Sequence, residues 1–232
     1  MKTTINCFIP FADAAQAEKT IQGLKSSNLV KDIYLLVTED TEVPLQGCRI
    51  LHVPALNSTA TMRIIAAHSD ADYTLFYTKY TTLKLGMFAL ERMTRIAEDS
   101  VAGMVYADHY QVSEGIQKNA PVIDYQFGSL RDDFNFGSVL LYKASALQEA
   151  VTRMKTDYQF AGLYDLRLKL SQKESLVHIN EYLYSEIEND TRKSGEKIFD
   201  YVDPKNRGVQ IEMEQACTEH PVSYTHLTLP TI

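Results

Sequence analysis

Short, almost wholly apolar runs alternate along the chain with longer segments in which apolar residues recur every three or four positions. The apolar runs lie at residues 3–10, 33–37, 48–53, 73–77, 101–107, 137–142 and 176–184. Their length and their content of β-branched and aromatic residues predict buried strands. The helically spaced segments lie at residues 14–24, 57–68, 86–99 and 145–154. Strands that alternate with helices in this way predict an α/β fold with a mostly parallel sheet and right-handed crossovers.

Local signals mark the ends of some of these elements. Asp13 stands where it can cap the helix that follows, and Asn57 or Ser58 stands at the start of the next one. Residues 113–115, Ser-Glu-Gly, separate two short strand-like segments and predict a tight hairpin turn. Residues 127–136 are polar and aromatic without periodicity, so we expect a loop across a cleft.

The polar pattern changes near the carboxyl end of the sequence. Residues 186–197 are highly charged, and we expect a solvated loop there. Residues 206–219 predict an amphipathic helix that leads out of the domain, with Val209, Met213 and Cys217 on one face.

Composition sets limits on the class of protein. A chain of 232 residues with 45% hydrophobic and 23% charged residues suits one α/β domain, or one domain and an appendage. The net charge of −7 without a basic cluster argues against nucleic acid as a partner, and no apolar run is long enough to predict a membrane span. Three widely spaced cysteines predict free thiols in a reducing cytoplasm.

Residues 71–86, ADYTLFYTKYTTLKLG, carry the most specific signal. The stretch resembles the centre of inverting family-2 glycosyltransferases of the GT-A fold, in which a small residue, an acid, a tyrosine and apolar residues lead to an Asp-x-Asp motif and a turn that ends in glycine. The positions that fit are Ala71, Asp72, Tyr73, Phe76 and Gly86. Thr78, Lys79, Tyr80 and Thr81 stand where the metal-binding aspartates would be.

The resemblance implies a fold, a donor and an acceptor. The fold is GT-A-like: a mostly parallel, Rossmann-like sheet flanked by helices, with a small antiparallel extension. The donor is a nucleotide sugar, and the acceptor is a glycan or lipid-linked sugar in polysaccharide synthesis. The residues implied on the donor side are Pro10, Glu39, Arg63, Thr78, Lys79 and Tyr80. On the acceptor side, the implied residues are Asp108, His109 and Arg131.

The segment at residues 158–170 resembles the one that carries the catalytic acidic pair in the family. Aligning Tyr164, Asp165 and Leu166 with the aromatic, Asp and Leu of that segment puts Gly162 and Leu163 in the place of the pair. Asp165 is then the nearest candidate for the base that deprotonates the acceptor.

The sequence favours no divalent metal at this site. Residues 78–81 offer hydroxyls and an ammonium where Mn²⁺ or Mg²⁺ prefers carboxylate oxygens, so we expect no metal cofactor. Three functions stay open: an active family-2 glycosyltransferase, a degenerate GT-A module that docks or orients a downstream catalytic domain or binds a glycan, and, more distantly, a nucleotidyltransferase without the usual basic loop.

The expected domain organisation has three parts. Residues 1–204 form the GT-A-like domain, and residues 205–220 form a helix that leads to a downstream region of the parent chain. Residues 221–232, PVSYTHLTLPTI, resemble a translated sequencing adapter and are expected to be a non-native tail.

Overall fold

The structure, a computed structural model, describes residues 3–38, 43–188 and 207–222. Residues 221 and 222 are described by their backbone only. Its strands are β1 (Ile5–Pro10), β2 (Val30–Val37), β3 (Arg49–His52), β4 (Tyr73–Tyr77), β5 (Thr82–Leu85), β6 (Met104–Ser113), β7 (Ile116–Ala120), β8 (Val139–Lys143) and β9 (Leu176–Ile187). Its helices are α1 (Ala14–Lys25), α2 (Thr59–Ala67), α3 (Ala89–Ser100), α4 (Ala144–Thr152), α5 (Gly162–Ser171) and α6 (Arg207–Val222).

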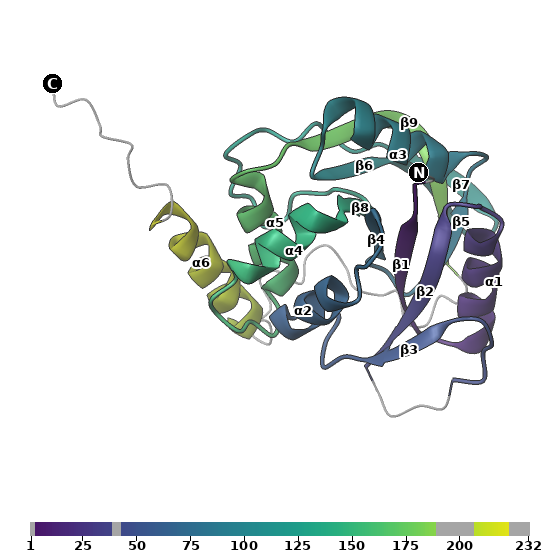
Figure 1. Ribbon diagram of the computed structural model, residues 1–232, viewed down its shortest axis with the longest axis horizontal. Helices are drawn as coiled ribbons and strands as arrows, with labels where there is room; N and C mark the ends of the chain where they lie inside the picture. The colour runs from purple at the N-terminus through teal and green to yellow at the C-terminus, as the bar shows by residue number, and fades with distance from the viewer. Residues whose placement is uncertain (1–2, 39–42, 189–206, 223–232) are drawn as a thin grey trace, which may run out of the picture.

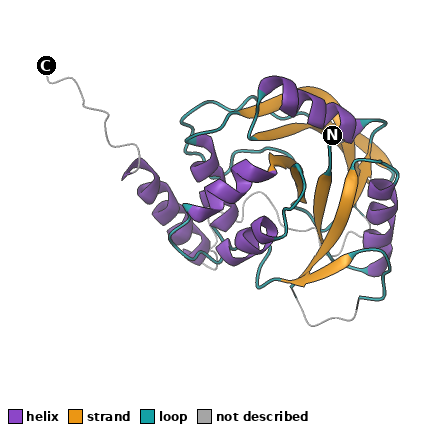
Figure 2. Ribbon diagram, in the orientation of Figure 1, coloured by secondary structure: helices purple, strands orange, loops and turns teal. Residues whose placement is uncertain are grey.

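All the described strands belong to one curled sheet with helices on both faces (Figures 1 and 2). The strand order is β3-β2-β1-β4-β8-β6-β9-β5, and β7 pairs with β6. The pairings of β1 with β2 and β4, of β2 with β3, and of β6 with β9 are parallel. The pairings of β8, β5 and β7 with their neighbours are antiparallel. The predicted α/β class and mostly parallel sheet are therefore confirmed.

The alternation of side chains along the strands fills two apolar cores, one on each face of the sheet. In β1, Ile5, Cys7 and Ile9 point into the core that α1 and α3 cover, whereas Phe8 points into the core covered by α2, α4 and α5. All of β1 is buried, as a strand covered on both faces requires. The sheet can then hold polar side chains at its carboxyl edge without exposing its core.

Several local predictions are confirmed. The Asp13 carboxylate accepts a hydrogen bond from the backbone N–H of Gln16 at 2.8 Å, and Ser58 caps α2. The hairpin turn between β6 and β7 places Glu114 and Gly115 at φ values of 53° and 76°, the left-handed region that two-residue hairpin loops need.

One strand, and the end of another, differ from what the sequence predicts. β5 was predicted as part of a turn, but it pairs with β9 across about a hundred residues of sequence. β9 continues through Glu186, which was expected in a solvated loop and is instead 3% exposed. The rest of that expected loop lies in residues 189–206, outside the described residues, as does the proposed boundary at residue 204.

Helix α6 packs against α5 (Figure 1). Ala216 is fully buried in a small core with Tyr158 and Leu168, and Met213 and Cys217 pack against it. The Glu212 carboxylate accepts hydrogen bonds from the backbone N–H groups of residues 159–161, directly before α5, at 2.6–3.1 Å. Two of the three residues predicted on one face of this helix therefore face the domain.

Candidate functional site

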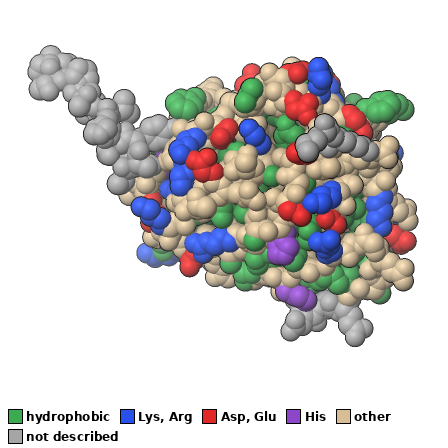
Figure 3. All heavy atoms as spheres, viewed as in Figure 1, with side chains coloured by type: hydrophobic (Ala, Val, Ile, Leu, Met, Phe, Trp, Pro, Cys, Tyr) green, Lys and Arg blue, Asp and Glu red, His purple; other side chains and the backbone are tan. Residues whose placement is uncertain are grey.

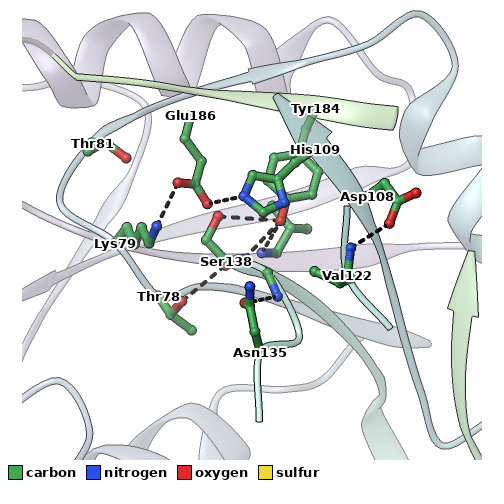
Figure 4. Close-up of polar contacts among 12 residues, drawn as sticks. Thr78, Lys79, Thr81, Asp108, His109, Val122, Asn135, Ser138, Tyr184 and Glu186 are labelled. Atoms are coloured by element: carbon green, nitrogen blue, oxygen red, sulfur yellow. Dashed lines mark hydrogen bonds and ion pairs between the residues drawn. The ribbon is translucent and has the colours of Figure 1, made fainter. Parts of the chain in front are cut away.

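The candidate site lies at the carboxyl end of β4, next to the point where the strand order reverses. From β1 the chain adds β2 and β3 on one side and β4 on the other. Open α/β sheets bind ligands at such a switch point, outside the carboxyl ends of the strands. Residues 78–81 follow β4 here, which is the place that the sequence analysis assigned to the donor diphosphate (Figure 4).

An ion pair joins the end of β4 to β9. The Lys79 ammonium lies 2.7 Å from Glu186 Oε2; the Lys79 side chain is 46% exposed, whereas that of Glu186 is 4% exposed. The second carboxylate oxygen of Glu186 lies 3.2 Å from Nε2 of His109, which is 2% exposed (Figure 4). We call these three residues the open cluster. It brings together two predicted site residues, Lys79 and His109, with one that the sequence analysis did not select.

Tyr184 packs against the open cluster and is itself held by hydrogen bonds to the backbone. The His109 ring stacks on that of Tyr184, with centroids 5.0 Å apart and planes 4° from parallel. The Tyr184 hydroxyl accepts hydrogen bonds from the backbone N–H groups of Ser138 and Val139 at 2.8 and 3.3 Å. A side chain at Gly137 is excluded, since its Cβ would lie 2.4 Å from that hydroxyl at a φ of 72°. Burial raises the pKa of Tyr184 to about 12, so the phenol stays protonated.

The donor set at residues 78–81 does not fit a divalent cation. The Thr78 hydroxyl donates to the carbonyl of Ser138, the Thr81 hydroxyl is hydrogen-bonded to that of Tyr77, and the Lys79 ammonium adds positive charge. Mn²⁺ and Mg²⁺ prefer carboxylate oxygens. Within residues 3–38, 43–188 and 207–222, no group of three or more His, Cys, Asp or Glu side chains could hold a metal ion.

A cavity of about 220 Å³ opens beside Thr78. Its walls come from the loop before β8, from the start of α5 and from α6, and they combine aromatic rings with amide, hydroxyl and carboxylate groups. The polar lining residues are Asn57, Thr78, Asp132, Asn135 and Arg167. Asp132 supplies the one carboxylate among the lining residues. Aromatic faces next to a few polar groups are suited to a sugar ring.

Arg167 holds the loop wall of this cavity. Its guanidinium, on a side chain that is largely buried, donates to the carbonyls of Ser129 and Arg131 at 2.6 Å each. It also lies over the rings of Tyr125 and Tyr164, 5.8 and 4.9 Å from their centroids. The expected loop at residues 127–136 is thus present and fixed against α5.

The two positions aligned with the family's acidic pair carry no acid, and the first of them, Gly162, has no room for one. A Cβ on Gly162 would lie 2.2 Å from the backbone nitrogen of Thr59, so only glycine fits where α5 meets α2. Leu163 lines the cavity with an apolar side chain. The place expected for a general base is therefore apolar.

Asp165 lies in α5, which packs against α6, and it is not among the residues that line the cavity. Its side chain is 1% exposed, and Oδ1 lies 3.3 Å from the ammonium of Lys169, itself 10% exposed. Burial raises the pKa of Asp165, against the opposing effect of Lys169. We call Asp165 and Lys169 the sealed pair. A carboxylate so enclosed does not reach an acceptor in the cavity, and this corrects the sequence-based choice of Asp165 as base.

The remaining predicted residues are dispersed. Pro10 is buried at the end of β1, and Arg63 pairs with Asp157 on the outer side of α2. Asp108 is buried, accepts from the backbone N–H of Val122 at 2.8 Å, and lies 2.9 Å from Nε2 of His178. Arg131 is exposed and forms two hydrogen bonds to the Asp133 carboxylate. Tyr80 is 44% exposed.

Glu39 is predicted on the donor side and Asp108 on the acceptor side. Glu39 lies outside the described residues, so its expected contact with the nucleotide stays a prediction. Asp108 is 1% exposed, and its Oδ1 is occupied by contacts with Val122 and His178, so its expected contact with an acceptor stays a prediction.

In the view of Figure 3, basic and acidic side chains are interspersed over the surface. Among the described helices, none combines the length and apolar character that crossing a bilayer requires.

No protein-family profile matches the sequence, and no curated protein matches it. Solved structures do. The chain is similar to S. aureus TarS 1-349, a family-2 glycosyltransferase, with a TM-score of 0.58 and 8% identity over 80% of this chain and 60% of that one. The complex of TarS 1-349 with UDP-GlcNAc gives a TM-score of 0.66 and 9% identity over 98% and 68% of the two chains. The structure titled S. aureus TarS gives 0.57 and 9% over 80% and 37%.

These likenesses establish a shared fold. At 8–9% identity they confirm the predicted GT-A-like architecture and nothing finer. The chain spans 60% of the first of these neighbours.

Proposed function

We propose that this chain is a family-2-like glycosyltransferase domain that binds a nucleotide sugar and transfers its sugar to a glycan or lipid-linked acceptor. The observation that carries the proposal is the GT-A-like fold with a polar cluster at the carboxyl end of β4, and its structural neighbour TarS is described in complex with UDP-GlcNAc. A cytoplasmic location, a downstream domain of the parent chain and a role in polysaccharide synthesis belong to the same proposal.

On the donor side, the nucleotide diphosphate would lie against residues 78–80. Thr78 and Tyr80 bring hydroxyl groups, and the half-exposed Lys79 brings a positive charge to the position where a metal ion would stand. A leaving diphosphate needs its developing charge neutralised, and an ammonium can do so without a metal. The transfer would therefore be independent of Mn²⁺ and Mg²⁺.

On the acceptor side, a sugar ring would enter the cavity beside Thr78. Its volume of about 220 Å³ suits one ring and not an oligosaccharide. Deprotonating the acceptor hydroxyl requires a base within hydrogen-bond reach. Asp132 is the carboxylate among the lining residues, so it takes the role that the sequence analysis had given to Asp165.

Calorimetric titration with UDP-, GDP- and dTDP-sugars tests the donor half of the proposal. We expect one nucleotide class to bind, with the same affinity in EDTA and in Mn²⁺. Failure of every donor to bind at millimolar concentration would overturn the glycosyltransferase assignment.

A second candidate is a non-catalytic GT-A module that orients a downstream domain or holds a glycan. The apolar Leu163 and the closed Gly162 position favour it, because they remove both acids of the catalytic pair. Donor turnover by the chain and by its Asp132→Asn variant separates the two candidates. Turnover that falls at least tenfold in the variant supports the enzyme; donor binding without turnover in either protein supports the module.

A further inference from the structure

In the open cluster one buried carboxylate lies between two groups that can carry a positive charge, the Lys79 ammonium and the His109 imidazole. Glu186 Oε1 and His109 Nε2 lie 3.2 Å apart, and neither atom, nor His109 Nδ1, has another hydrogen-bond partner among the described residues. Both side chains are at most 4% exposed. Buried polar atoms are nearly always paired, so the protons that His109 carries decide how this contact is satisfied.

The neutral Nε2–H tautomer of His109 can already donate to Glu186 Oε1, and a further proton on Nδ1 would turn that contact into an ion pair. A protonated imidazole donates from both nitrogens and would form a charge-assisted bond with the Glu186 carboxylate. Without that proton, the net charge of Lys79, Glu186 and His109 is zero, because Glu186 neutralises Lys79. With that proton, the cluster carries a net charge of +1. The protonated His109 can then neutralise Glu186, so the Lys79 ammonium is free to pair with another anion.

We propose that the open cluster binds the diphosphate of the nucleotide sugar with a proton in the place of a divalent cation. His109 takes up the proton from solvent when the diphosphate arrives, and Lys79 turns its donors toward the phosphate oxygens. This inference rests on the proposed donor site. Glu186 is then a positioning residue, since it acts on the ligand through Lys79.

The surroundings of His109 are suited to such an exchange. Burial lowers the pKa of His109, Glu186 opposes that effect, Lys79 adds to it, and Asp108 opposes it. From β9 the ring also faces Tyr184, whose phenol is neutral, and Tyr77 of β4 carries a neutral phenol close to Glu186. In the free protein, burial and Lys79 therefore hold the pKa of the ring below its usual value, which favours the neutral imidazole. A polyphosphate that draws Lys79 away from Glu186 removes one cause of the lowered pKa and adds negative charge nearby, and both changes favour the proton.

The sign of the pH dependence follows. If binding takes up a proton, the affinity for the diphosphate rises as the pH falls toward the pKa of the free ring. This is opposite to a metal-dependent site, in which acid displaces the cation from its carboxylates.

Isothermal titration calorimetry tests the proposal with UDP, GDP and dTDP, each compared with its nucleoside, at pH 6.0–8.0 in EDTA. Two buffers of different ionisation enthalpy give the number of protons taken up. Because a nucleoside diphosphate also titrates, the quantity that matters is the difference between the wild type and His109→Gln. We expect a difference of about 0.3–1 proton per site, and no proton uptake with the nucleoside.

Two further variants sharpen the result. Glu186→Gln frees Lys79 permanently, so its diphosphate affinity should be at least equal to that of the wild type at pH 6.0 and should change with pH only through the ionisation of the diphosphate itself. Lys79→Met should weaken the diphosphate by roughly tenfold or more while leaving the nucleoside unchanged, whereas Lys84→Met, an exposed lysine on β5, should bind as the wild type does. Circular dichroism confirms folding of each variant.

The outcomes separate the inference from the function on which it rests. Diphosphate binding with equal proton uptake in the wild type and His109→Gln overturns the inference and leaves the donor site standing. Nucleoside binding that gains nothing from the diphosphate also overturns it. Absence of binding by every nucleotide and nucleoside at millimolar concentration overturns the proposed function itself.

Discussion

Two lysine–carboxylate pairs in this molecule share a buried carboxylate but differ in the exposure of the lysine. In the sealed pair, Lys169 is 10% exposed and Asp165 1% exposed, and α6 packs against the helix that carries both residues. In the open cluster, Glu186 is equally enclosed, but Lys79 is 46% exposed at the carboxyl edge of the sheet. From sequence alone, Asp165 of the sealed pair is the predicted catalytic acid, whereas Glu186 of the open cluster falls in a predicted solvated loop. The position of the lysine relative to solvent, and not the acid itself, distinguishes a site that can meet a ligand from one that supports the fold.

The largest expected effect comes from breaking the sealed pair. Asp165→Ala leaves the Lys169 ammonium buried without its partner, and we expect a loss of about 3 kcal/mol in the free energy of unfolding. Denaturant unfolding measures it. Asp157→Ala, at an exposed position on the same side of the molecule, is the control and should change stability by less than about 0.5 kcal/mol. Equal losses in the two variants would contradict the difference in burial.

Acid should weaken the same region through His220 on α6. Burial, together with Lys169 and Arg167, lowers the pKa of His220 from 6.5 to about 4. The unfolded chain therefore binds a proton that the folded chain does not, and this contribution to stability is present above pH 6.5 and lost as the pH falls toward 4. We expect the wild type to lose about 2 kcal/mol more than His220→Gln between these pH values. Parallel pH profiles of the two proteins would contradict the assignment.

Breaking the open cluster should affect stability less than breaking the sealed pair. Lys79→Met removes a cation that water already reaches, and His109 can take up a proton against the remaining Glu186 carboxylate. We expect a loss of about 1.5 kcal/mol in the free energy of unfolding, against about none for Lys84→Met. A loss as large as that of Asp165→Ala would mean that the two sites do not differ in the way described.

The smallest effect concerns how α6 is attached to α5. Glu212→Ala removes the acceptor of three backbone N–H groups before α5, and we expect a loss of about 1 kcal/mol. Amide hydrogen exchange should quicken at residues 159–161. Glu214→Ala, an exposed neighbour on the same helix, should change neither quantity.

Most of the fold was predictable because its signals are local. Apolar runs such as 73–77 and caps such as Asp13 act within a few residues, and the structure has them where the sequence predicts them. β5 was missed because it is short and its partner, β9, lies about a hundred residues away. A strand whose pairing is that distant leaves little trace in its own sequence.

The candidate site was predictable only in part, for the same reason. The location of residues 78–81 after β4 followed from strand order and from the family resemblance. Glu186 could not be selected, because its importance arises from contacts with Lys79 and His109, which are 107 and 77 positions away. Asp165 was selected from alignment alone, and burial of its helix face, which depends on α6, decides against it.

The central claim is that a ligand diphosphate binds beside residues 78–80 without a metal ion. Backbone NMR spectra recorded during titration with the tightest-binding nucleoside diphosphate, and separately with Mn²⁺, test it directly. We predict that the nucleotide shifts the signals of Thr78, Lys79 and Tyr80 in EDTA, and that micromolar Mn²⁺ broadens none of them selectively. Selective broadening around Thr78 and Tyr80 at micromolar Mn²⁺ would contradict the account and indicate a conventional metal-dependent site.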